Sequence, residues 1–369
     1  MRLKAVPATL AVAVLTLSLS ATVCADDVQN LKITRPAYSN DLVINLQRTR
    51  QEPIQSIEPA KVTDPAKVEL GKQLFFDPRL SRSGFISCNS CHNLSMGGSD
   101  NLVTSIGDRW RQGAIRVPTV FNASLNAAQS RDGRAQTLAE QTGGSIASPM
   151  EMNSTPQAAE NMLNTIPGYR DQFKQVYQLD RIGIAQITDA LAAFESTLVT
   201  PNSRFDQWLR GNDKAITANE RAGYELFKIA GCITCHSGPA ANSSGYQQID
   251  VVRTYPVRNP VIGSAGATGD QNDRMMFKVP TLRNVELTYP YFHDGAAKTL
   301  PDAVQIMGQI QLGRNFTDDE NVKIVAFLKT LTGNLPSFRL PQLPLSGDNT
   351  PRPNPFAPPA SSASLLQQP

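Results

Sequence analysis

Two copies of one pentapeptide constrain this chain more than any other feature of its 369 residues. The sequence reads CNSCH at residues 88–92 and CITCH at residues 232–236. Two thiols at this spacing add to the two vinyl groups of a haem, and the adjacent histidine then ligates the iron. The motifs predict two covalently attached c-type haems, one on Cys88, Cys91 and His92 and one on Cys232, Cys235 and His236.

Two other interpretations of the cysteines explain less of the pattern. A zinc site would join both C-x-x-C units around one metal, and a disulfide framework is common in exported chains. Neither explains why a histidine follows each pair directly. The chain has only three histidines, and the haem interpretation uses two of them.

Residues 1–25 have the pattern of a signal peptide. Arg2 and Lys4 precede the apolar stretch ATLAVAVLTLSLSA, and the small-residue sequence VCA ends at Ala25. The alternative is a lipid anchor on Cys24, but the residues before it make a poor lipidation site. We therefore expect an exported, periplasmic protein without a stable membrane anchor.

The composition is that of a globular protein and does not suggest a polyanionic partner. Apolar residues make up 40% and charged residues 18% of the chain. The 35 basic and 32 acidic residues give a net charge of +3, and there is no basic run. We expect no binding to nucleic acid.

The chain also repeats itself around the two motifs. VPTVFNAS at 117–124 recurs as VPTLRNVE at 279–286, and RDGRAQTL at 131–138 recurs as HDGAAKTL at 293–300. The interval from Val117 to Asp132 equals that from Val279 to Asp294, at 15 positions. Shared turns at a constant spacing indicate an internal duplication rather than coincidence between helical patterns.

The duplication predicts a mainly α fold with two tandem cytochrome c-like haem domains. Helical periodicity is clear in ITDALAAFESTL and in ENVKIVAFLKTLTG. After the signal peptide we expect an N-terminal arm (26–55), a first haem domain (56–200), a second haem domain (201–335) and a Pro-rich tail (336–369). The composition of the Pro-rich tail predicts that it is extended and poorly ordered.

The two repeats differ at a position that matters for iron ligation. Met307 lies fourteen residues after His293, and the matching position in the first repeat is Ser145. A haem with His and Met axial ligands is an electron-transfer centre of raised potential, whereas a haem without the Met keeps a position free. Core packing is the alternative role for Met307, and Met275 and Met276 compete as ligands.

The sequence resembles the bacterial dihaem cytochrome c peroxidases over about residues 50–335. The phrases that carry this resemblance are LGKQLFFDPRLSRSGFISCNSCHNLSMGG, NSRFDQWLRG, FKVPTLRNVELTYPYFHDG, AVQIMGQIQLG and IVAFLKTLTG. The resemblance implies reduction of hydrogen peroxide to water in the periplasm. The N-terminal haem would be the peroxide site and the C-terminal His/Met haem would receive electrons from a small cytochrome c or cupredoxin.

The resemblance also implies further site residues. A Glu and a Gln over the peroxide haem fall on Glu151 and Gln141, where the carboxylate would move a proton and the amide would hold peroxide. A calcium ion between the domains would use the carbonyls of Thr288 and Pro290 and an Asn that is Arg116 here. A homodimer is left open.

Two more positions depart from the family. Asp108 stands where the distal His is usual, and Arg131 stands where a Trp between the haems is usual. A buried guanidinium needs a partner. We therefore expect an Asp108–Arg131 ion pair, with the haem propionates as competing partners for Arg131. Without a distal His, the first haem should be open in the oxidised protein.

Two other functions use the same scaffold. A non-catalytic electron carrier or redox sensor would tolerate Arg131, whereas Glu151 and Gln141 favour the enzyme. A dihaem oxidase resembling the methylamine-utilisation enzyme usually has Tyr at the place of Met307, so Met307 argues against it.

Overall fold

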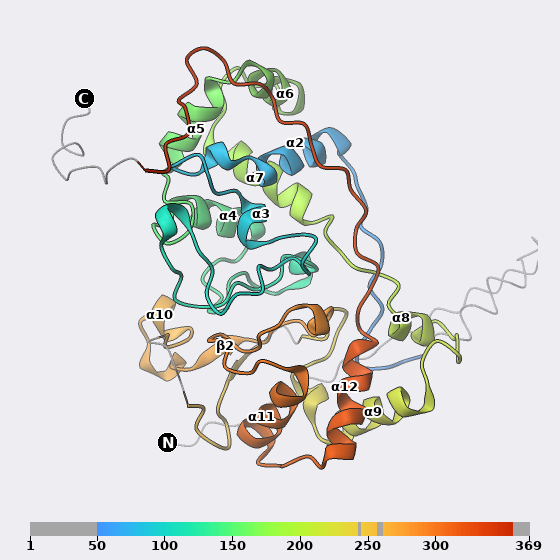
Figure 1. Cartoon of the computed structure of the whole chain (residues 1–369). Helices are drawn as coiled ribbons and strands as arrows, with labels where there is room; N and C mark the ends of the chain where they lie inside the picture. The colour runs from blue at the N-terminus through green and yellow to red at the C-terminus, as the bar shows by residue number, and fades with distance from the viewer. Residues whose placement is uncertain (1–49, 243–244, 257–260, 357–369) are drawn as a thin grey trace, which may run out of the picture. The chain divides into compact units, whose positions relative to one another are not determined.

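The structure, a computed structural model, describes residues 50–242, 245–256 and 261–356 (Figure 1). The expected signal peptide and most of the expected N-terminal arm lie outside the described residues. The α-helices are α2 (Pro65–Phe76), α3 (Cys88–Cys91), α4 (Leu138–Ala147), α5 (Pro156–Asn164), α6 (Pro167–Tyr177), α7 (Ile184–Glu195), α8 (Arg204–Leu209), α9 (Ala218–Ile229), α10 (Ala265–Thr268), α11 (Leu300–Leu312) and α12 (Asp318–Lys329). Strands β1 (Tyr246–Gln248) and β2 (Met276–Lys278) pair antiparallel, with Gln247 opposite Phe277. The predicted mainly α fold is confirmed.

Local sequence explains where the main helices begin. Thr137 and Glu140 form a capping box at the start of α4, and Thr217 and Glu220 form one at the start of α9. Such a box satisfies backbone N–H groups that have no partner inside the helix. The helix α2 begins with Pro65 after the N-cap Asp64, a position where proline loses no hydrogen bond.

Each haem motif lies in a domain built on a closely packed helix pair. In the first domain, a β-carbon on Gly71 of α2 would lie 1.9 Å from the carbonyl oxygen of Ala190 in α7. In the second domain, a β-carbon on Gly223 of α9 would lie 1.9 Å from the carbonyl oxygen of Lys323 in α12. Only glycine permits both approaches. The two domains therefore use the same packing device.

The structure also repeats around the duplicated phrases. Gln129 forms an isolated β-bridge with Ala135, and at the equivalent positions Tyr291 forms one with Ala297. Asn122 and Asn284 both have a left-handed backbone, with φ of 61° and 58°. Their side-chain amides both donate to the hydroxyl of Thr200, at 2.8 and 2.9 Å. The predicted duplication is thus visible in the backbone.

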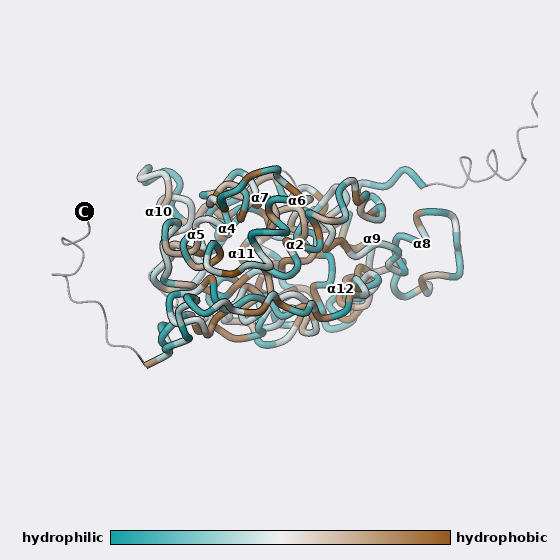
Figure 2. The backbone as a smooth tube through the Cα atoms, turned by 90° about the horizontal axis from the view of Figure 1, so that it is seen from above, coloured by the Kyte–Doolittle hydropathy of each residue, from teal (hydrophilic) through white to brown (hydrophobic). Residues whose placement is uncertain are grey.

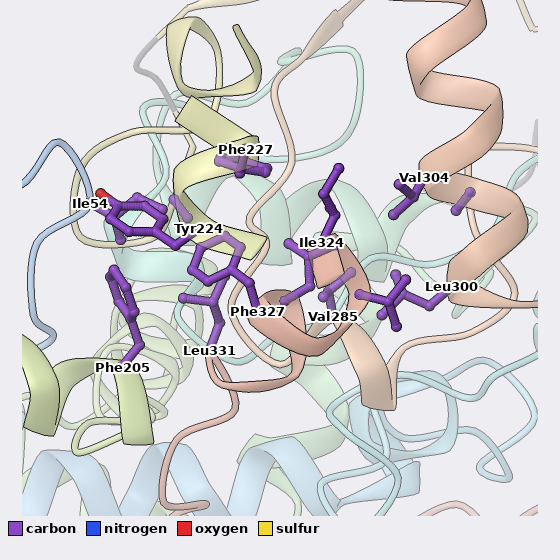
Figure 3. Close-up of a cluster of buried hydrophobic side chains, with 14 of the residues drawn as sticks. Ile54, Phe205, Tyr224, Phe227, Val285, Leu300, Val304, Ile324, Phe327 and Leu331 are labelled. Atoms are coloured by element: carbon purple, nitrogen blue, oxygen red, sulfur yellow. The ribbon is translucent and has the colours of Figure 1, made fainter. Parts of the chain in front are cut away.

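The segment before α2 belongs to the core of the second domain. Ile54 is fully buried there with aromatic residues that include Phe205, Tyr224 and Phe327 (Figure 3). Its backbone forms a parallel bridge with Gly238, close to the second haem motif. A segment that precedes the first domain in the sequence therefore packs into the second domain.

The tail follows the second domain in the sequence but contacts the first domain. Beyond α12 it extends along the helices of the first domain (Figure 1). Arg79 donates to the carbonyl of Pro344 at 3.0 Å, and the amide of Asn354 donates to the carbonyl of Ser83 at 2.8 Å. The ring of Phe338 lies 5.8 Å from that of Phe76. The expectation of a poorly ordered tail was wrong for residues 336–354, because side chains of the first domain supply partners that composition does not reveal.

Hydrophilic and hydrophobic residues are mixed along the described chain (Figure 2). Among the described residues, no helix is both long enough and apolar enough to cross a membrane.

Candidate haem sites and the contacts between them

A cavity of about 540 Å³ lies in the second domain next to its C-x-x-C-H motif. Cys232, Cys235 and His236 line one side of it. Met307 of α11 lines the same cavity, whereas Met275 and Met276 do not. Met275 is instead buried in a small apolar cluster with Tyr255 and Phe277. The arrangement favours Met307 over its competitors as the second ligand.

The imidazole of His236 is prepared for ligation. Its Nδ1 lies 3.1 Å from the carbonyl oxygen of Ala241, which orients the ring and leaves Nε2 for iron. Burial lowers the pKa of His236 to about 4, so the ring is neutral at physiological pH, as a ligand must be. Among the described residues, Cys232 and Cys235 form no disulfide, and the cavity is lined mainly by apolar groups. These residues fit a haem.

The first motif has the same chemistry in a different setting. Cys88 and Cys91 are the first and last residues of α3, and neither forms a disulfide with another described residue. Burial lowers the pKa of His92, and the nearby carboxylate of Glu151 opposes this shift. Burial raises the pKa of both Cys88 and Cys91, and the same carboxylate adds to these shifts. Glu151 therefore lies near the attachment residues of the first haem.

Gln141 and Ser145 are neighbours on α4, the helix equivalent to α11. The side-chain amide of Gln141 donates to the hydroxyl of Ser145 at 2.8 Å. Ser145 takes the place that Met307 has in the second repeat, and its hydroxyl is a much weaker iron ligand than a thioether. No described residue on α4 supplies a sulfur or imidazole ligand.

Asp108 is fully buried, and its partners belong to the first domain. Its carboxylate accepts hydrogen bonds from the backbone N–H of Ser83 at 3.1 Å and from the side-chain amide of Asn153 at 3.1 Å. Its cationic neighbour is Arg109, at 3.8 Å. The expected ion pair between Asp108 and Arg131 was wrong, because neighbours in the surrounding loops already satisfy this carboxylate.

Arg131 instead lines the cavity of the second haem. Its Nε donates to the carbonyl of Arg116 at 3.0 Å. Burial, with repulsion from Arg116, lowers the pKa of Arg131 to about 9, and Asp294 opposes the shift. The guanidinium still carries its charge at neutral pH. A residue of the first repeat therefore places a cation in the second haem site.

Arg116 occupies the expected calcium position. It is 4% exposed, and its guanidinium donates to the carbonyl of Tyr289 at 3.3 Å and to the hydroxyl of Ser99 at 3.2 Å. Tyr289 lies between the two residues, Thr288 and Pro290, whose carbonyls the resemblance assigned to calcium. A fixed positive charge here would repel Ca²⁺. Among the described residues there is also no cluster of three potential His, Cys, Asp or Glu ligands. The site does not fit calcium.

Three residues near the haem sites were missed by sequence analysis. Glu195, 5% exposed at the end of α7, has its pKa raised to about 8 by burial and lies near Cys88. Lys278 and His293 line the second cavity. The duplication could have pointed to both residues, because Lys278 is the repeat equivalent of Arg116 and His293 is that of Arg131.

Comparison with known proteins agrees with this geometry. The family model of the di-haem cytochrome c peroxidases matches residues 65–214, and the cytochrome c model matches residues 220–332. The chain is 57% identical over 305 residues to cytochrome c551 peroxidase of Nitrosomonas europaea, covering 83% of this chain and 91% of the relative. It is 45% identical to cytochrome c551 peroxidase of Pseudomonas aeruginosa, covering 77% and 84%. A MauG-like protein associated with microbial copper homeostasis shares the fold, with a TM-score of 0.67, 24% identity and coverage of 77% and 95%.

The fold and the two motifs define a protein with two c-type haems in cytochrome c-like domains. The chain belongs to the bacterial dihaem cytochrome c peroxidase family. It is an oxidoreductase that reduces hydrogen peroxide. The predictions of fold, cofactor and enzyme class are confirmed, and the non-catalytic alternative is set aside.

Proposed function

We propose that the two haems of this peroxidase have separate tasks, peroxide reduction at the first and electron entry at the second. The observation that carries this proposal is the difference between Ser145 on α4 and Met307 on α11, at equivalent positions of the duplicated fold. When bound, the haems supply the two electrons that reduction of peroxide to water requires. The protein decides which haem keeps a position for peroxide, by offering a sulfur ligand to only one.

Glu151 and Gln141 have the chemistry that the first site needs. Cleavage of the O–O bond requires a proton to move from one peroxide oxygen to the other, and a carboxylate near the site can accept and return it. The carboxylate of Glu151 lies close enough to the first motif to influence the pKa of all three of its residues. We assign the proton transfer to Glu151 and the positioning of peroxide to Gln141.

The first haem should be open in the fully oxidised enzyme. Of the three histidines, His92 and His236 belong to the motifs, and His293 lines the second cavity. Asp108, which stands at the usual place of a distal His, is engaged with Ser83 and Asn153. No histidine is left to close the first site, so turnover should not require prior reduction.

Electron paramagnetic resonance of the oxidised protein tests this arrangement. We expect one high-spin haem beside one low-spin His/Met haem. Steady-state turnover with a reduced small cytochrome c should be the same with and without prior reduction. Two low-spin signals together with a requirement for reduction would contradict the proposal, because another side chain would then be closing the first site.

Substitution of the carboxylate tests the proton transfer. Glu151→Gln should lower peroxide turnover by about a hundredfold or more, the usual loss for a positioned acid/base, while both haem spectra stay unchanged. Glu58→Gln, at an exposed carboxylate, is the control. Equal turnover in the two variants would remove Glu151 from the reaction.

We further propose a periplasmic location, a small cytochrome c or cupredoxin as the donor, and no bound calcium. The signal-like residues 1–25 support export, and the Arg116 guanidinium supports the absence of calcium. Fractionation of the expressing cell, turnover with each purified donor and metal analysis of the purified enzyme test these points. Sedimentation of the holoenzyme tests whether it forms a homodimer.

A further inference from the structure

The two repeats meet in a reciprocal backbone contact. The N–H of Arg116 donates to the carbonyl of His293 at 2.9 Å, and the N–H of Lys278 donates to the carbonyl of Arg131 at 2.9 Å. Arg116 and Lys278 occupy equivalent positions in the duplication, and so do Arg131 and His293. Each repeat therefore contacts the other through the same two positions. All four residues at these positions are basic.

These four basic side chains all line the cavity of the second haem. We call Arg116, Arg131, Lys278 and His293 the basic cluster. They lie close together, since Nε of Arg131 donates to the carbonyl of Arg116 at 3.0 Å and the N–H of Lys278 donates to the carbonyl of Arg131 at 2.9 Å. Arg131 also repels Lys278 electrostatically. Burial with this repulsion lowers the pKa of the Lys278 ammonium to about 8. Like charges are concentrated here in a partly dehydrated site.

The protein itself supplies too few partners for the cluster. Across the described part of the chain, no carboxylate lies within ion-pair distance of Arg116, Arg131 or Lys278. Asp294, whose charge opposes the pKa shift of Arg131, accepts a hydrogen bond from Tyr255 on Oδ1 at 2.7 Å, and its Oδ2 makes no hydrogen bond within the described residues. His293 is 2% exposed, and neither ring nitrogen has a partner among the described residues. Buried cations that lack a carboxylate partner favour an anionic ligand.

The ligand must be an anion that shares this cavity with the haem attachment residues. A c-type haem carries two propionate carboxylates, and it is held at its other edge by the thioether bonds. Planar guanidinium groups bind carboxylates through two parallel hydrogen bonds. We propose that the basic cluster binds the propionates of the second haem, with Arg131 of the first repeat as the main positioning residue.

This assignment has a consequence for the haem that does not depend on turnover. Positive charge near a haem favours the reduced iron, which carries one positive charge less. Removing the charge of Arg131 should therefore lower the potential of the second haem. The first repeat would in this way help to keep the electron-entry haem at high potential, even though its iron ligands come from the second repeat.

An equilibrium redox titration of the holoenzyme without peroxide tests the proposal. In Arg131→Gln, the ratio of reduced to oxidised second haem at a fixed potential should fall about tenfold, which is 59 mV for one electron. Arg131→Lys should keep most of the ratio. Arg134→Gln is the matched control, because Arg134 lies on the same loop but is exposed and pairs with Asp132.

Resonance Raman spectra supply a second measurement. If Arg131 had a purely structural role, its substitution would leave the propionate bands of these spectra unchanged. The propionate bending band of the second haem should shift in Arg131→Gln and stay unchanged in Arg134→Gln. If Arg131→Gln does not fold, the band in Arg131→Lys should still shift, because an ammonium replaces the planar donor. A titration of Arg131→Gln identical to that of Arg134→Gln would overturn the proposal, and so would a shift confined to the first haem. Neither result depends on peroxide turnover, so the proposed division of tasks could fail independently.

Discussion

At the scale of single residues, Met307 decides what the second haem does. It lines the cavity that holds Cys232, Cys235 and His236 and has no competing methionine there. Met307→Ala should remove the near-infrared charge-transfer band of a His/Met haem and lower its potential, because the axial ligand tunes that potential. Haem attachment should be unaffected, since both thioether bonds remain. Survival of the band in the variant would mean that another side chain is the ligand, and Met276→Ala would then be examined.

Glu195 gives a pH dependence with a definite sign. Burial raises its pKa from 4.5 to about 8, so the folded protein holds a proton that the unfolded chain releases. Its contribution to stability is complete below about pH 4.5 and is lost as the pH rises toward 8. In this window it should lower the free energy of unfolding by up to about 1.4 kcal/mol per pH unit.

Urea unfolding of the holoenzyme between pH 5 and pH 8 measures this effect. Glu195→Gln keeps the shape of the side chain without the titration, so its free energy of unfolding should fall less steeply with pH than that of the wild type. Parallel profiles for the two proteins would show that Glu195 is already ionised in the folded state.

At the scale of elements, close helix pairs hold each domain together. A β-carbon on Gly71 would meet the carbonyl oxygen of Ala190 at 1.9 Å and Cβ of Phe194 at 2.9 Å, so Gly71→Ala must push α2 away from α7. The cost should be about 1–3 kcal/mol, as for other overpacked sites. Gly144→Ala on the exposed face of α4 meets no atom within 4 Å and should stabilise by roughly 0.5–1 kcal/mol. Urea midpoints of the two variants should move in opposite directions. Equal midpoints would mean that the helix pair can separate without cost.

At the scale of the whole molecule, the described segments before α2 and after α12 connect the two domains. Ile54 is buried in the second domain, whereas Pro344 and Asn354 bond to the first. A protein that ends at Leu335 should lose the contacts to Arg79 and Ser83. Each lost hydrogen bond contributes roughly 0.5–1.5 kcal/mol, so the first domain should be destabilised more than the second.

Hydrogen exchange measured by mass spectrometry locates this loss. Exchange should become faster in residues 78–87 and stay unchanged in α9 and α12. A protein that ends at Phe356 keeps all the described tail contacts and is the control. Equal protection in both truncated proteins would show that the tail does not stabilise the first domain.

The sequence by itself determined the features whose chemistry is local. The haem motifs require a spacing of a few residues along one chain, and the duplication is a property of order alone. The difference between Ser145 and Met307 follows once the repeats are aligned. None of these depends on which distant segments meet.

Only the tertiary structure decided how the charged residues are paired. Asp108 and Arg131 looked complementary in the sequence, but Asp108 is satisfied by Ser83 and Asn153, and Arg131 enters the cavity of the other domain. The composition of the tail does not reveal its contacts with Arg79 and Ser83. Ion pairs and hydrogen bonds form over a few ångströms in space, and the fold alone brings residues separated by more than a hundred positions within that reach.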